Sequence, residues 1–98
     1  MGSLGSRLAV SHASLKRSIR MALRMRGCLV TSNPAGGGVL DLTVCSPSGR
    51  YIEIDVKVGR DKLSALQKDR IAKVRRTGGI AHEVRSVDEA LSICGLDE

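Results

Sequence analysis

The feature that most constrains the fold is a pair of alternating segments separated by a short turn. Residues 39–45 and 51–58 alternate apolar and polar side chains with a period of two, and Ser46-Pro47-Ser48-Gly49 lies between them. This period predicts β-strands, and the turn residues between the two segments predict an antiparallel β-hairpin. The second strand separates its faces, with Ile52, Ile54, Val56 and Val58 on one side and Tyr51, Glu53, Asp55 and Lys57 on the other.

The other predicted elements surround this hairpin. The sequence favours a helix over 14–26, a strand over 28–32, a helix over 64–77, a strand over 80–85 and a helix over 86–95. The order α-β-β-β-α-β-α combines a hairpin with a β-α-β crossover, which predicts an α/β fold with a mixed β-sheet flanked by helices. A chain of 98 residues accommodates one such domain, which we place at 13–98. We expect residues 1–12 to be an N-terminal extension, in part disordered or left by a purification tag.

Composition excludes several classes of protein. The chain has no Phe or Trp and a single Tyr, so it cannot bind nucleic acid by stacking bases on an aromatic platform. Its three cysteines form no C-x-x-C motif, which argues against a disulfide framework or a zinc site and favours a reducing compartment. No apolar run is long enough for a membrane span or resembles a signal peptide.

The net charge of +6 is concentrated in two segments. Residues 1–26 carry six basic side chains and no acid, and residues 58–78 carry seven basic side chains against two acids. Two basic segments that are both helical by pattern favour a surface for nucleic acid, although ordinary solvated helix faces would give the same composition. The candidate DNA contacts are Lys16, Arg17, Arg20, Arg24, Arg60 and Lys62.

The hairpin also brings two acids together. If its turn has three residues, Pro47 to Gly49, position 46 pairs with 50 and Asp41 lies opposite Asp55. Facing carboxylates repel, and a divalent cation between them removes that penalty. A four-residue turn would shift the register and separate them. Lys57 shares their face about 7 Å along the strand, where an ammonium can act on a metal-bound water or on phosphate.

The alternative is an exposed strand face with ordinary charged residues. On that face Glu53 either supplements the metal site or is a solvated charge. Gln67 also has two readings that are hard to combine: it either reaches the site, near Lys57, or serves only as the third helical residue of the Ser64 capping box. We favour the first. His82 lies between Ile80 and Val84 on an apolar face, which predicts a core histidine.

Four segments together resemble a known family. They are GVLDL at 38–42, IEIDVK at 52–57, GRDKLSALQ at 59–67 and RRTGGIAHEVRSVDEAL at 75–91. They resemble the VRR-NUC domain, the virus-type replication and repair nuclease branch of the PD-(D/E)xK superfamily, which has a restriction-endonuclease-like fold. The resemblance implies that Asp41 and Asp55 bind Mg²⁺ or Mn²⁺ together with the Val56 backbone carbonyl. It further implies that Lys57 is the catalytic lysine and that Gln67 is the family's glutamine.

The sequence departs from that family in the first helix. The family usually has a Glu there that assists a metal ion or its water, whereas His12 or Ser14 stands at about that place here. The resemblance implies a metal-dependent DNA endonuclease, similar to the small stand-alone phage members that cut branched DNA such as four-way (Holliday) junctions as homodimers. It places the protein in the cytoplasm of a bacterial or phage-infected cell. The alternative is a non-catalytic nucleic-acid-binding module that keeps the fold.

Overall fold

The structure is a computed structural model that describes residues 10–96. Most of the predicted extension at 1–12 therefore lies outside the described residues. Seven elements follow in the predicted order: α2 (His12–Met25), β1 (Leu29–Ser32), β2 (Leu42–Cys45), β3 (Tyr51–Val56), α3 (Ala65–Arg76), β4 (Ile80–Val84) and α4 (Val87–Ile93). The predicted α/β class and element order are confirmed.

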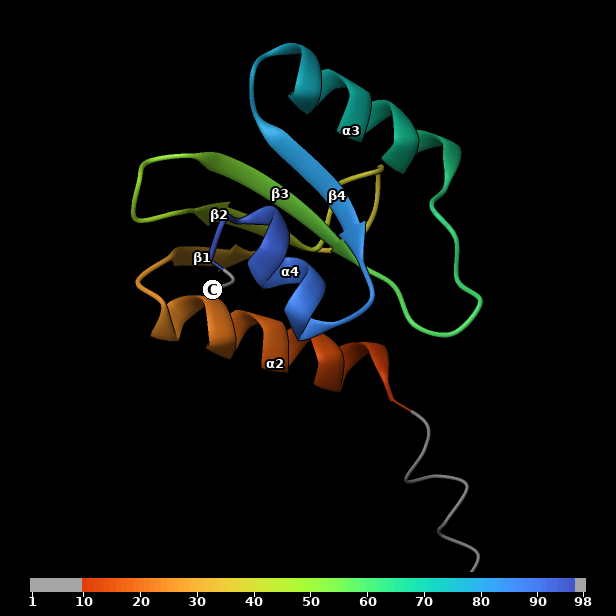
Figure 1. The fold of residues 1–98 in the computed structure, drawn as a ribbon. Helices are drawn as coiled ribbons and strands as arrows, with labels where there is room; N and C mark the ends of the chain where they lie inside the picture. Colours follow the sequence, from red (N-terminus) through yellow and green to blue (C-terminus); the bar gives the residue numbers. More distant parts are fainter. Residues whose placement is uncertain (1–9, 97–98) are drawn as a thin grey trace, which may run out of the picture.

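The four strands form one mixed sheet between two helical layers. The strand order is β1-β2-β3-β4, with antiparallel pairing up to β3 and parallel pairing between β3 and β4. Helices α2 and α4 cover one face of the sheet, and α3 covers the other (Figure 1). The crossover through α3 connects β3 to its parallel neighbour β4, as parallel pairing requires.

The hairpin turn has three residues, as one of the two predicted registers requires. Ser46 N–H donates to the Arg50 carbonyl at 3.1 Å, and Gly49 takes a φ of 87°, which glycine adopts without strain. The strands pair Leu42 with Ile54 and Cys45 with Tyr51. One step beyond the first of these pairs, the same register sets Asp41 opposite Asp55.

Both faces of β3 are buried, so the alternative of an exposed, solvated strand face is wrong. Ile52, Ile54 and Val56 pack with α2 and α4 in the larger core cluster. On the opposite face, Glu53 and Asp55 are each only 2% exposed. The alternation gave the two faces correctly, but α3 covers the polar one.

Strand β2 is shorter than the 39–45 segment suggested. It begins at Leu42, and three glycines with positive φ turn the chain just before it: Gly36, Gly37 and Gly38. Alternation continued over 39–45 predicts that Leu40 shares a face with Leu42, and this prediction is wrong. Leu40 is fully buried on the other side of the sheet, with Ile71 and Val74 of α3.

Side-chain caps set the helix ends. Ser11 accepts a hydrogen bond from Ser14 N–H at 3.0 Å, so α2 begins at His12, two residues earlier than predicted. The Ser64 capping box of α3 is complete. In α4, Ser86 is the N-cap, and Glu89 accepts from Arg85 N–H instead of closing a capping box. Within residues 10–96, no helix combines the length and the apolar character needed to cross a membrane.

Candidate active site

Asp41 lies in the bend that leads into β2, and Asn33 holds this bend. Asn33 N–H donates to the Asp41 carbonyl at 2.9 Å. Its side-chain amide donates to the Leu40 carbonyl at 3.1 Å and to the Thr43 hydroxyl at 2.8 Å. Sequence reasoning missed Asn33, because an Asn-Pro dipeptide indicates only a turn and not the segment that its side chain will bind.

Gly38, three residues before Asp41, packs against the start of α3 and is not a flexible linker. A Cβ at this position would lie 2.7 Å from Leu66 Cβ and 2.9 Å from the Leu66 carbonyl oxygen. Its φ is +80°. The position therefore excludes larger residues on two independent grounds, steric and conformational.

Gly38→Ala is expected to lower the free energy of unfolding by about 2 kcal/mol or more, since it adds backbone strain to a steric clash. Gly37→Ala is the matched control, because Gly37 has a φ of +64° and a Cβ added there would meet no heavy atom within 4 Å. It should lose only the strain, about 1–2 kcal/mol. Urea denaturation measures both. Equal losses of unfolding free energy at the two positions would show that Leu66 moves away from the added Cβ at no cost in stability.

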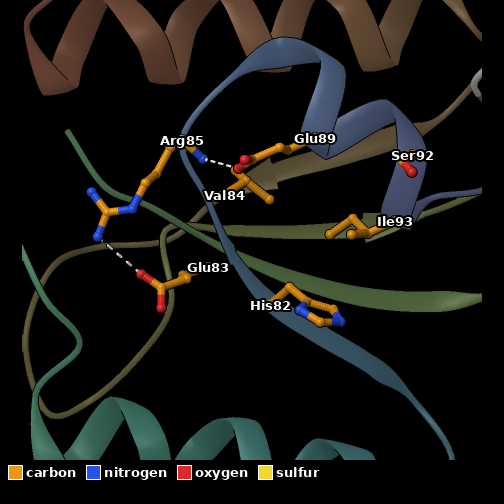
Figure 2. A pocket seen from close by; sticks show the side chains of 7 residues that line it. All are labelled: His82, Glu83, Val84, Arg85, Glu89, Ser92 and Ile93. Atoms are coloured by element: carbon orange, nitrogen blue, oxygen red, sulfur yellow. Dashed lines mark hydrogen bonds and ion pairs between the residues drawn. The ribbon is translucent and has the colours of Figure 1, made fainter. Parts of the chain in front are cut away.

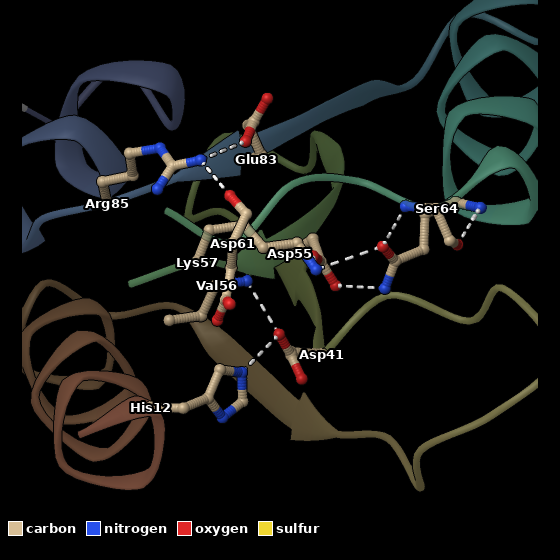
Figure 3. Close-up of polar contacts among 10 residues, drawn as sticks. His12, Asp41, Asp55, Val56, Lys57, Asp61, Ser64, Glu83 and Arg85 are labelled. Carbon is tan, nitrogen blue, oxygen red and sulfur yellow. Dashed lines mark hydrogen bonds and ion pairs between the residues drawn. The ribbon is translucent and has the colours of Figure 1, made fainter. Parts of the chain in front are cut away.

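The Asp41 carboxylate is fixed by contacts from two other elements. Its Oδ2 accepts a hydrogen bond from Val56 N–H at 2.7 Å and lies 3.1 Å from His12 Nε2 (Figure 3). Of the two first-helix candidates, His12 is therefore the one that reaches Asp41. Ser14 instead bonds to Ser11 at the start of α2.

The Asp55 carboxylate is buried beside Lys57. Its Oδ2 lies 3.0 Å from Lys57 Nζ, and its Oδ1 accepts from Gln67 Nε2 at 3.3 Å. Burial raises the pKa of Asp55 above its ordinary value, and the Asp41 carboxylate raises that pKa further, while the Lys57 ammonium opposes both. The protein thus holds two interacting carboxylates where a single one is already unfavourable.

Gln67 performs both of the roles that the sequence made hard to combine. Its Oε1 accepts from Ser64 N–H at 2.9 Å, which closes the capping box, and also from Lys57 Nζ at 3.2 Å. Its Nε2 donates to Asp55. One amide therefore joins the start of α3 to Asp55 and to Lys57. The prediction that Gln67 reaches the site instead of capping α3 was incomplete, because the residue does both.

The two carboxylates fit a divalent cation. Asp55 Oδ2 is buried, and the Lys57 ammonium lies 3.0 Å from it. The repulsion between Asp55 and Asp41 remains, and a divalent cation between the two carboxylates would remove it. In residues 10–96 no three His, Cys, Asp or Glu side chains gather as ligands. Two carboxylates suit an ion such as Mg²⁺, which keeps several waters.

Comparisons with known proteins agree with this picture at the level of the fold. No protein-family model and no curated protein matches the sequence. A solved structure described as a VRR_NUC domain aligns with a TM-score of 0.70 over 86% of this chain and 94% of that chain, at 21% sequence identity. This chain has the fold of a VRR_NUC domain. The resemblance predicted from the four sequence segments is confirmed at that level.

In this VRR_NUC fold, Glu53 has neither of the two roles predicted for it, a supplement to the metal site or a solvated charge. It does not reach the two acids and it is not a solvated charge. Arg70 of α3 donates to it twice, at 2.8 and 2.6 Å, and the Tyr51 hydroxyl also donates to it. The Arg70 guanidinium lowers the pKa of Glu53, which keeps the carboxylate ionised.

The prediction that His82 is a core histidine is wrong. The residue is exposed and lies 3.3 Å from the Arg75 guanidinium. Its face of β4 is apolar, but β4 is an edge strand, and an open pocket of about 340 Å³ lies beside His82 and Ile93 (Figure 2). Alternation assigns a face to a residue but does not show whether another element covers it.

The predicted DNA contacts lie on two surfaces. Arg17, Arg20 and Arg24 line one side of α2 with Met21 and Met25, around a shallow pocket of about 260 Å³. Arg24 also donates to the Val30 carbonyl at 3.2 Å, and Lys16 is half-buried. Arg60 and Lys62 are exposed in the loop between β3 and α3.

Arg85 is a second residue that sequence reasoning missed. Its guanidinium donates to the backbone carbonyl of Asp61 and contacts Glu83 at 3.3 Å (Figure 3). It also donates to the Gly59 carbonyl at 2.9 Å. It therefore ties the loop that follows Lys57 to the end of β4. A lone Arg at a strand end gave no signal of this role.

Proposed function

We propose that this protein is a metal-dependent endonuclease that hydrolyses phosphodiester bonds in DNA, and that its substrates are branched molecules such as four-way junctions. The observation that carries the proposal is the convergence of Asp41, Asp55, Lys57 and Gln67 at one end of β3, in a chain with a nuclease-type fold. A module that only binds phosphate has no use for two facing carboxylates beside a lysine. One of these carboxylates, that of Asp55, is also buried.

Each residue of the site has a distinct part in the proposal. Asp41, Asp55 and the Val56 backbone carbonyl would hold Mg²⁺ or Mn²⁺. A bound ion of this type lowers the pKa of water and offsets charge on the phosphate. Lys57 orients the attacking water or stabilises the negative charge that develops on the phosphate. Gln67 holds Lys57 and Asp55 in place, and His12 orients Asp41.

Affinity for DNA comes from the basic surfaces. Arg17, Arg20 and Arg24 follow one side of α2 over about two turns, roughly 10 Å, which can track a phosphate backbone. A homodimer would present two sites to the two strands of a junction. We place this activity in the cytoplasm of a bacterial or phage-infected cell.

The basic stripe on α2 gives a salt-dependence prediction. Replacing Arg17, Arg20 and Arg24 together with Ala should reduce the slope of log affinity against log salt by about 2.7, because each lost phosphate contact removes about 0.9. Fluorescence anisotropy with labelled duplex measures the slope. The matched control replaces three exposed basic residues elsewhere with Ala: Arg50, Lys73 and Arg76. If both triple variants change the slope equally, the α2 stripe has no special contact with DNA.

One observation favours a second candidate, a non-catalytic DNA-binding module. Within residues 10–96 no three His, Cys, Asp or Glu side chains gather as a set of metal ligands, although His12 contacts Asp41. A degenerate site would leave the fold and the basic surfaces in use while the metal is no longer bound.

Cleavage assays separate the two candidates. Labelled duplex, flap and four-way-junction DNA are incubated with the protein in Mn²⁺, Mg²⁺ or EDTA, and sedimentation velocity of the same sample gives its oligomeric state. The nuclease proposal expects metal-dependent cutting, fastest on the junction, by a dimer. Binding of all three DNAs without cutting would favour the module, and cutting by a strict monomer would remove the two-site explanation of junction cleavage.

A further inference from the structure

An ion pair between a buried acid and a partly exposed arginine lies next to the candidate site without taking part in it. Glu53 of β3 is 2% exposed, and Arg70 of α3 binds both of its carboxylate oxygens. The Tyr51 hydroxyl donates to the same carboxylate. A bidentate Arg–carboxylate pair fixes orientation as well as distance, because two parallel hydrogen bonds define a plane.

This pair matters because the apolar contact between α3 and the sheet is small. The core cluster under α3 has four buried residues, whereas the cluster on the opposite face has twelve. The four are Leu40, Ile71, Val74 and Ala81. Apolar contact is non-directional, so a cluster this small allows a helix to slide or rotate more easily than a polar clamp does.

The Glu53–Arg70 pair and the Gln67–Asp55 contact both join α3 to β3. Glu53 and Asp55 are two residues apart on one face of β3, about 7 Å along the strand. Gln67 and Arg70 are three residues apart on one side of α3, about 5–6 Å between their Cβ atoms. The Arg70–Glu53 and Gln67–Asp55 contacts are therefore neighbouring links between α3 and β3.

We propose that the Glu53–Arg70 ion pair sets the position of α3 on β3 and thereby places the Gln67 amide against Asp55 and Lys57. Glu53 and Arg70 are positioning residues that act through Gln67. Arg70 is required as arginine, because lysine keeps the charge but cannot supply the two-pronged contact. The kinetic consequence rests on the proposed nuclease function, whereas the placement of Gln67 does not.

The sequence makes the placement directly observable. The chain contains one Gln and one Asn, so an ¹⁵N-labelled sample gives two side-chain amide pairs, from Gln67 and Asn33. In Arg70→Lys, metal-free, the Gln67 pair should move to its free-amide position and exchange with water at least tenfold faster, while the Asn33 pair stays. Ile71→Val, which weakens the same helix–sheet contact without touching the ion pair, should leave both amide pairs in place.

A Gln67 pair that stays unchanged in a folded Arg70→Lys protein would overturn the proposal. If Arg70→Lys does not fold, Glu53→Asp replaces it in the same experiment, with the same expected and contradicting results, because it draws the carboxylate away from Arg70 and adds no side-chain amide. In DNA cleavage, Arg70→Lys should lower kcat about tenfold in the wild-type background and not at all in a Gln67→Ala background. A protein that cuts no DNA would contradict the nuclease function alone, and the amide spectra would still decide the positioning role.

Discussion

Asp55→Asn should abolish DNA cleavage, with a loss of at least about a thousandfold, which corresponds to about 4 kcal/mol of transition-state stabilisation. The side chain is buried and holds one of the two proposed metal-binding carboxylates. Single-turnover cleavage in Mn²⁺ measures the loss. DNA affinity should stay within about twofold, because phosphate contacts come from basic residues elsewhere.

The same substitution should not lower stability. Burial and the Asp41 carboxylate raise the pKa of Asp55, so the charged form is disfavoured in the folded protein relative to the unfolded chain. Asn removes that charge at nearly constant volume, and Lys57 is not left without a partner, because it is less buried than Asp55 and keeps its hydrogen bond to Gln67 Oε1. We expect the melting temperature to stay the same or rise. If the variant cuts at the wild-type rate, Asp55 is not part of the site. A large fall in melting temperature would show that the ionised Asp55 side chain stabilises the fold, which contradicts the view that this buried charge serves function.

Lys57→Met should produce the opposite combination, a loss of cleavage together with a loss of stability. Lys57 is the cation nearest the buried Asp55 carboxylate, at 3.0 Å. Removing one partner of a buried pair leaves an uncompensated charge and costs about 3–5 kcal/mol. Urea denaturation measures the free energy of unfolding, and the cleavage assay should show a loss comparable to that of Asp55→Asn.

The double variant Asp55→Asn, Lys57→Met tests the cause of that instability. With neither charge present, most of the lost stability should return, while cleavage stays absent. A double variant as unstable as Lys57→Met alone would show that the lysine stabilises the protein through its packing and not through Asp55.

The relation of the two acids was predictable because short-range chemistry determines it. The Ser46 hydroxyl accepts from Arg50 N–H, and Gly49 takes the positive φ of a three-residue turn. That turn length sets the register, and the register sets Asp41 opposite Asp55. Helix starts at Ser64 and Ser86 were equally local, since the capping side chain and its partner lie within a few residues of one another.

The failures of prediction have long-range causes. Alternation predicts on which face of the sheet Glu53 and His82 lie, but it does not predict which element covers that face. Helix α3 covers Glu53 and supplies Arg70, seventeen residues later, whereas His82 stands at an uncovered edge of the sheet. The dual role of Gln67 likewise depends on how α3 sits on β3. Leu40 was misplaced because the glycines before Asp41 end the strand earlier than its alternation suggests.

Calorimetric titration of Mn²⁺ into the DNA-free protein tests most directly whether Asp41 and Asp55 form a metal centre. We expect one site per chain, because only two carboxylates meet there among residues 10–96, and tighter binding of Mn²⁺ than of Mg²⁺, in line with the general affinity order of divalent ions. Asp55→Asn should abolish the binding heat. Gly37→Ala is the control, because it changes neither carboxylate, and it should retain the binding heat. Binding that is equally strong in Asp55→Asn, or no binding to the wild-type protein at millimolar Mn²⁺, would contradict the proposed site.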